Sequence, residues 1–179
     1  MSIICFGDSN TYGYDPRSYL GGRYGGSERW VDILGAKTQR QVENRGLNGR
    51  EIPRSGADCA GEGCELFLVM VGTNDLLRGC SAHETGVRME RFLTTLSPAP
   101  RRILLLAPPV LQRGEWVSGE RLIEESEKLE GVYRALAERL GADFAAAGRL
   151  ELCYDGVHLS EEGHRQLAEK LCAVLRKQA

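Results

Sequence analysis

Short, nearly continuous apolar runs alternate along the chain with longer amphipathic segments. The runs at 3–6, 66–71 and 103–107 contain almost no polar positions, as expected of strands that are covered on both faces of a parallel sheet. Two weaker runs, 41–44 and 143–146, have the polar positions expected of edge strands. This alternation is typical of an α/β domain with a mainly parallel sheet.

Between these runs, apolar residues recur three and four positions apart, which predicts four helices that each bury one face. The marker positions are Trp30, Val31 and Leu34; Met89, Phe92, Leu93 and Leu96; Leu129, Val132, Tyr133, Leu136 and Leu140; and Leu167, Leu171, Val174 and Leu175. Ser160 is a suitable N-cap for the last helix, because Glu161 and Glu162 favour its first turn. The Gly-rich segment 50–65 lacks such a repeat, so we expect an irregular flank there.

Composition narrows the class of protein without identifying it. A chain of 179 residues with 42% hydrophobic and 27% charged residues suits one soluble domain, which we expect to span 1–179. The formal net charge of -2 provides no field that would attract nucleic acid. No apolar run approaches the roughly 20 residues of a membrane helix, and the first residues have no secretion signal. We therefore expect a cytoplasmic protein without a nucleic-acid or membrane partner.

Six cysteines are spread over the chain, at Cys5, Cys59, Cys64, Cys80, Cys153 and Cys172. In a chain large enough to form a core we expect reduced thiols, with Cys5 and Cys172 buried in apolar patterns. Cys59, Cys64 and Cys80, followed by His83, form a loose set that would be a zinc site in an alternative interpretation. Their spacing matches no strong zinc motif, so we expect no metal.

Polar and glycine-rich motifs follow the predicted strands directly. In a parallel sheet the carboxyl ends of the strands meet at one edge, where ligands and substrates bind. The motifs expected at this edge are Ser9, 44–50, 72–75, Pro108-Pro109, and the loop that holds Asp155 and His158.

Ser9, His158 and Asp155 have the side chains that nucleophilic catalysis requires. A serine hydroxyl needs a base to remove its proton, and the imidazole of His158 titrates near neutral pH. Asp155, three residues earlier, would orient that ring and stabilise its charged form. Taken singly, each motif also fits an ordinary connection: a turn after a strand, a solvated aspartate or a loop histidine.

Attack on a carbonyl carbon creates an oxyanion, which needs hydrogen-bond donors that are already in place. The backbone N–H groups of Ser9 and Gly49 and the side-chain amide of Asn74 are the candidates. Gly49 would otherwise be an ordinary left-handed turn position, and Asn74 an ordinary turn residue.

The four motifs, in this order, resemble those of the SGNH or GDSL-type family of serine esterases and lipases. They are Gly7-Asp8-Ser9, 44–50, Gly72-Thr73-Asn74-Asp75 and 155–160. The resemblance implies a flavodoxin-like three-layer α/β/α sandwich with a five-stranded parallel sheet. It also implies that Ser9 is the nucleophile, His158 the base and Asp155 its partner, that Gly49 and Asn74 complete the oxyanion hole, and that no cofactor is needed.

The stretches 46–50 and 107–109 look most like the bacterial arylesterase and acyltransferase branch of that family. We therefore expect hydrolysis of a small-molecule carboxylic ester, with a short-chain acyl or an aryl group, through an acyl-enzyme on Ser9. A thioesterase, a carbohydrate O-deacetylase or an acyltransferase would use the same residues. A non-enzymatic anion-binding module is disfavoured, because no phosphate-loop motif follows the first strand.

Four further residues need an interpretation. Asn10 stands where leucine often follows the serine in the family, and we assign it to the substrate pocket. Trp116 forms a pocket wall or, equally well, covers the core. His164 lies on the apolar face of the last helix and is expected to be a packed structural residue, whereas His83 is expected at a helix start. The sequence does not indicate an oligomeric state.

Overall fold

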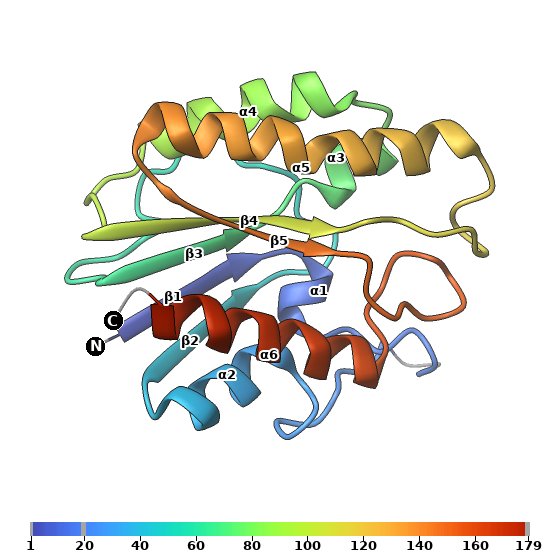
Figure 1. Ribbon diagram of the computed structural model, residues 1–179, viewed down its shortest axis with the longest axis horizontal. Helices are drawn as coiled ribbons and strands as arrows, with labels where there is room; N and C mark the ends of the chain where they lie inside the picture. The colour runs from blue at the N-terminus through green and yellow to red at the C-terminus, as the bar shows by residue number, and fades with distance from the viewer. Residues whose placement is uncertain (1, 19–20, 178–179) are drawn as a thin grey trace.

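The computed structural model describes residues 2–18 and 21–177, and it contains the expected five-stranded parallel sheet (Figure 1). The strand order is β2-β1-β3-β4-β5. The strands are β1 (Ser2–Gly7), β2 (Gln41–Gly46), β3 (Leu66–Met70), β4 (Arg102–Pro109) and β5 (Asp143–Gly148). The prediction that 41–44 and 143–146 form the edges is confirmed, although both strands are two residues longer.

Helices cover both faces of the sheet and complete a three-layer α/β/α sandwich, as predicted (Figure 1). They are α1 (Ser9–Tyr12), α2 (Trp30–Thr38), α3 (Thr73–Leu77), α4 (Ala82–Thr94), α5 (Glu120–Leu140) and α6 (Glu161–Lys177). Helices α2 and α6 pack together on one face, and α4 and α5 on the other. The four long helices correspond to the four apolar repeats in the sequence.

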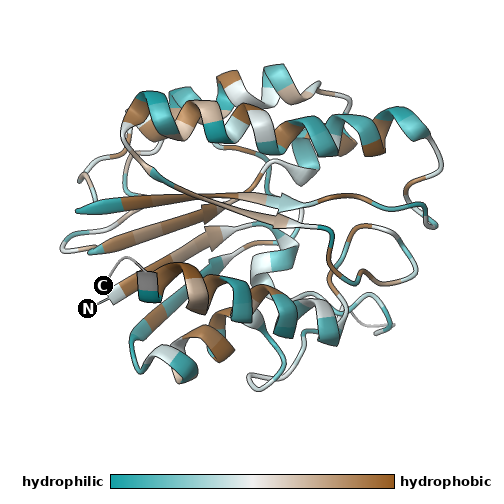
Figure 2. Cartoon of the chain, viewed as in Figure 1, coloured by the Kyte–Doolittle hydropathy of each residue, from teal (hydrophilic) through white to brown (hydrophobic). Residues whose placement is uncertain are grey.

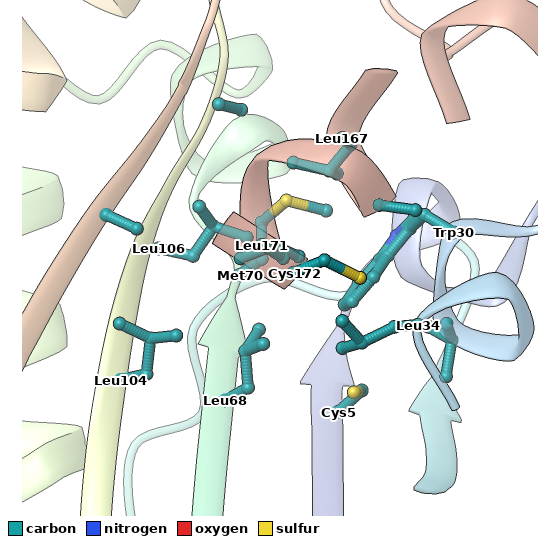
Figure 3. Close-up of a cluster of buried hydrophobic side chains, with 14 of the residues drawn as sticks. Cys5, Trp30, Leu34, Leu68, Met70, Leu104, Leu106, Leu167, Leu171 and Cys172 are labelled. Carbon is teal, nitrogen blue, oxygen red and sulfur yellow. The ribbon is translucent and has the colours of Figure 1, made fainter. Parts of the chain in front are cut away.

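The side chains of β3 alternate between two cores, one on each face of the sheet. Leu68 packs with Trp30 and Leu171 between the sheet and helices α2 and α6 (Figure 3). Phe67 packs with Phe92 on the opposite face. The apolar colour of the central strands and of the inward helix faces follows this arrangement (Figure 2), and burial on both faces explains the unbroken apolar runs.

Several local predictions are confirmed by the contacts. Ser160 caps α6, because its Oγ accepts the Gly163 N–H at 3.0 Å. The segment 47–65 contains neither a helix nor a strand of the sheet, and its backbone is ordered by turns and a single bridge from Ala57 to Ser97. Helices α1 and α3 were not predicted, because one turn is too short to display a helical repeat.

Cys5 and Cys172 lie in the core as predicted, and no disulfide joins any of the six cysteines within the described residues. Throughout 2–18 and 21–177, no three His, Cys, Asp or Glu side chains approach closely enough to hold a metal ion. The zinc interpretation of Cys59, Cys64, Cys80 and His83 therefore has no geometric basis. None of the helices in these ranges has the length and apolar character needed to cross a membrane.

Candidate active site

Ser9 begins a single-turn helix directly beyond the carboxyl end of β1. The turn depends on Gly7, where an added Cβ would overlap Thr11 Oγ1 and the Met70 carbonyl oxygen. Only glycine therefore allows α1 to fold back against β1 and β3. The result is a serine that is 7% exposed and lies at the carboxyl edge of the sheet.

Asp8 caps this short helix and is itself buried. One carboxylate oxygen accepts the Asn10 N–H at 3.0 Å, whereas the other has no hydrogen-bond partner among the described residues. Burial raises the pKa of Asp8 to about 6, although the Asn10 amide and the nearby His158 act in the opposite direction. Asp8 thus fixes the turn that carries Ser9. Because its carboxyl group is buried, ionisation of that group lowers the stability of the folded state.

Ser9, His158 and Asp155 are joined by two short contacts, as the sequence predicts. Ser9 Oγ lies 2.9 Å from His158 Nε2, and His158 Nδ1 lies 2.6 Å from Asp155 Oδ2. Burial acts to raise the pKa of Asp155, but the His158 ring and the backbone amides of His158 and Val157 outweigh this effect and hold the pKa below its ordinary value. Asp155 is therefore ionised at neutral pH and orients the ring.

Gly49 lies in an exposed turn that follows β2. Its φ of 72° is in the left-handed region, and an added Cβ would meet no atom within 4 Å. The turn starts close to Ser9 along the chain fold, because the Leu47 N–H donates to the Gly7 carbonyl at 3.1 Å. No hydrogen bond from the Gly49 N–H is found among the described residues.

Asn74 and Asp75, at the start of α3, hold the segment that follows this turn. Asn74 Nδ2 donates to the Arg50 carbonyl at 3.0 Å, which leaves its second N–H available. The buried Asp75 accepts the Ile52 N–H at 3.0 Å and pairs with Arg88 at 2.8 Å. The start of α3 thus sets the position of the chain that leaves β2.

Arg50 belongs to the motif 44–50, but no role was predicted for its side chain, which links the same elements. Its guanidinium donates to the Gly7 carbonyl at 2.8 Å and to the Arg45 carbonyl, and it lies 4.1 Å from the centre of the Phe6 ring. Arg50 is the last residue of the motif 44–50, and a charged residue in that place looks the same in the sequence whether its side chain is solvated or inserted.

Two aromatic rings flank the imidazole of His158. Trp116 meets it edge-on with ring centroids 5.3 Å apart, and Tyr14 is tilted against it at 4.7 Å. Trp116 is 54% exposed, so of its two interpretations the structure favours a wall beside the site. Tyr14 was missed, since an isolated tyrosine after a turn shows no pattern.

The interpretation of Asn10 as a pocket residue is wrong. Asn10 is only 2% exposed, and its side chain bonds the backbone on both sides of His158. The predictions for the other histidines are confirmed: His164 is fully buried on α6 and His83 lies in the first turn of α4. Burial lowers the pKa of His164 to about 3, so that it packs as a neutral ring.

A parallel α/β sandwich with serine, histidine and aspartate together at its carboxyl edge is typical of the serine hydrolases. The chain belongs to the GDSL-like lipase/acylhydrolase family, whose sequence model matches residues 5–166. The protein is accordingly an ester-cleaving enzyme of that family.

Solved structures agree with this assignment over the whole chain. The carbohydrate acetylesterase Est24 from Sinorhizobium meliloti is 25% identical, with 99% of each chain covered and a TM-score of 0.84. A carbohydrate acetylesterase family member from the same organism is 27% identical, with 98% and 97% covered and a TM-score of 0.81. The M. smegmatis aryl esterase is 25% identical, with 99% of each chain covered and a TM-score of 0.83. A search of curated proteins found no match.

Proposed function

We propose that the protein hydrolyses a small carboxylic ester through an acyl-enzyme on Ser9. The observation that carries this proposal is the pair of contacts that join Ser9 to His158 at 2.9 Å and His158 to Asp155 at 2.6 Å. A serine hydroxyl becomes nucleophilic when a neighbouring base removes its proton and a third group orients that base.

In the first half of the reaction, Ser9 Oγ forms a bond to the carbonyl carbon while its proton moves to His158 Nε2. The tetrahedral intermediate then breaks its bond to the departing alcohol oxygen, which takes the proton from His158. Asp155 stabilises the imidazolium that exists between these two transfers. In the second half, water gives a proton to His158 while its oxygen bonds the acyl carbon. The new intermediate then breaks its bond to Ser9 Oγ, which takes the proton back from His158, and the acid is released.

The negative oxygen of both tetrahedral intermediates is assigned to three donors. They are the backbone N–H groups of Ser9 and Gly49 and the second N–H of the Asn74 amide. The unpartnered Gly49 amide supports this assignment, and so does the Asn74–Arg50 bond, which fixes the plane of the Asn74 amide. Donors that are positioned before the reaction lower the barrier because they need no reorganisation when charge develops.

The proposed substrate has a short acyl group and a small alcohol. Aryl and carbohydrate esters are the two classes named for the similar structures. A sugar ester is a second candidate because Trp116 and Tyr154 are large exposed aromatics on the loops around His158, and aromatic rings stack on apolar sugar faces. We place the enzyme in the cytoplasm, where its six unpaired thiols would remain reduced.

Turnover of p-nitrophenyl acetate by the purified protein and by Ser9→Ala tests the nucleophile. We expect the substitution to reduce turnover to the background rate, and a fluorophosphonate to add covalently to Ser9. Ser55→Ala is the matched control and should be fully active, because Ser55 is exposed and, among the described residues, its side chain only accepts a backbone N–H. Full turnover in Ser9→Ala, or labelling of another residue, would refute the proposal.

A panel of acetyl esters separates the two substrate classes. Release of acetate from acetylated sugars and from aryl acetates is measured with the wild type and with Trp116→Ala. If the sugar ester is the substrate, Trp116→Ala should raise KM for the sugar more than for the aryl ester. An equal change for both classes would argue against sugar stacking on this ring.

A further inference from the structure

The side-chain amide of Asn10 forms two hydrogen bonds that enclose the catalytic histidine. Nδ2 donates to the Val157 carbonyl at 3.1 Å, and Oδ1 accepts the Leu159 N–H at 2.8 Å. These partners lie immediately before and after His158 and almost 150 positions from Asn10 in the sequence. The contact therefore joins two segments that share no local structure.

A primary amide presents one donor and one acceptor. Those of Asn10 match the Val157 carbonyl and the Leu159 N–H, although the backbone at 156–158 is bent rather than extended. The backbone groups of His158 itself bond elsewhere: its N–H donates to Asp155 Oδ1 at 2.9 Å, and its carbonyl accepts the Cys153 N–H at 2.7 Å. The main chain that carries the imidazole is thus held on both sides.

The backbone groups of Asn10 are also held by hydrogen bonds. Its N–H donates to Asp8 at 3.0 Å, and its carbonyl accepts the indole N–H of Trp30 at 2.9 Å. Trp30 is completely buried in the core. Every polar group of Asn10 consequently has a partner, and the residue is anchored to the core beneath the site.

Since Asn10 is the covalent neighbour of Ser9, these bonds close a ring. The path runs from Ser9 through the Asn10 amide to the backbone around His158, and returns from the imidazole to Ser9 Oγ. We propose that Asn10 is a positioning residue that sets the distance between the nucleophile and its base. This inference rests on the proposed roles of Ser9 and His158. It assigns Asn10 to the support of the catalytic residues and not to contact with the substrate.

Neither a leucine nor an aspartate at this position would preserve the contact under all conditions. Leucine has a similar volume but no polar atoms, so both backbone groups would lose a partner. A carboxyl group keeps both bonds only while it is protonated, because an ionised carboxylate has no donor for the Val157 carbonyl. The two substitutions therefore give different dependence on pH.

The first test compares wild type, Asn10→Leu and Asn10→Asp in the hydrolysis of p-nitrophenyl acetate. For Asn10→Leu we expect kcat to fall about 10–100-fold, because small displacements of reacting groups have effects of that size, with KM changed less than about threefold. For Asn10→Asp, the ratio of its kcat to that of wild type should fall as pH rises, whereas the ratio for Asn10→Leu should stay constant. Wild-type kcat in Asn10→Leu would overturn the proposal.

Ile3→Val is the control for stability alone. It removes a buried methyl group from the amino-terminal half of β1, at the end of the strand away from Ser9. We expect it to lower the melting temperature without changing kcat or the rate of phosphonate labelling. If Ile3→Val reduced kcat as much as Asn10→Leu at equal loss of stability, the effect of Asn10 would be general destabilisation and the proposal would be wrong.

A readout that does not depend on turnover separates this inference from the proposed function. The proton on His158 Nδ1, which is hydrogen-bonded to Asp155, should give a far-downfield ¹H NMR signal in the wild type. We expect the signal to broaden in Asn10→Leu, because the base is no longer fixed, and to stay sharp in Ile3→Val. A protein that hydrolyses no ester would refute the proposed function alone, whereas an unchanged signal in Asn10→Leu would refute the role of Asn10.

Discussion

Asp155 contacts both the ring and the backbone of His158. Its Oδ2 lies 2.6 Å from His158 Nδ1, while its Oδ1 accepts the N–H groups of Val157 and His158, each at 2.9 Å. The carboxylate therefore determines where the histidine lies and which ring nitrogen carries the proton. These two functions can be tested separately. Positioning of the backbone needs only an oxygen that accepts hydrogen bonds, whereas control of the ring proton needs the negative charge of the carboxylate.

Asp155→Asn should preserve the conformation of the loop around His158 and remove the negative charge beside the imidazole. The new amide still offers an oxygen to the backbone, but its NH₂ group would face His158 Nδ1 and favour the ring tautomer that cannot accept a proton from Ser9. We expect kcat to fall by about 10⁴, the effect of this change in a serine protease with the same three residues. Steady-state kinetics with p-nitrophenyl acetate measure it.

Asp143→Asn is the control for loss of an aspartate charge. Asp143 pairs with Arg102 at 2.7 Å at the amino-terminal edge of the sheet, opposite the site. Its substitution should leave kcat unchanged, because exposed ion pairs contribute little. If Asp155→Asn and Asp143→Asn were equally active, Asp155 would have no part in the mechanism.

Asn74→Ala should impair catalysis without abolishing it. The substitution removes one proposed oxyanion donor and also leaves the Arg50 carbonyl without its partner at 3.0 Å. Loss of one such donor costs about 10²–10³ in kcat. The expected pattern is a reduced kcat with nearly unchanged KM, since the donor acts mainly on the transition state. A large rise in KM at constant kcat would instead identify Asn74 as a ground-state binding residue.

The fold was predictable because its signals are local. Parallel strands such as β3 are apolar on both faces, helices such as α5 have one apolar side, and the carboxyl-edge rule places Ser9 and His158 together without knowledge of any contact. The one-turn helices α1 and α3 were missed because they are shorter than any repeat.

The wrong interpretation of Asn10 has a different cause. Its polar side chain suggested a substrate contact, but its partners are backbone groups of Val157 and Leu159, which have no signature in their own side chains. The role of the Arg50 side chain was missed for the same reason, since it donates to the backbone carbonyls of Gly7 and Arg45. Contacts from a side chain to a distant backbone depend on the assembled fold and not on local pattern.

Two glycines in the packed pair α4 and α5 should respond oppositely to alanine. Gly131 lies on the exposed side of α5, and an added Cβ meets nothing within 4 Å. Gly131→Ala should increase the free energy of unfolding by about 0.5–1 kcal/mol, because alanine is the better helix former. Gly86→Ala should lose stability instead, since its Cβ would overlap Val132 between the helices. Urea unfolding compares them, and equal gains would show that the helices do not pack as described.

Asp8→Asn should change how stability depends on pH. The pKa of Asp8 rises from its ordinary 3.8 to about 6 on burial, so between these values the folded state keeps a proton that the unfolded state has released. Its contribution to the free energy of unfolding therefore falls as pH rises through this window. Asparagine can still accept the Asn10 N–H but never ionises. Relative to wild type, we expect Asp8→Asn to gain roughly 2 kcal/mol between pH 4 and pH 7, measured by urea unfolding at each pH. Parallel curves for the two proteins would mean that the pKa of Asp8 is the same in the folded and unfolded states.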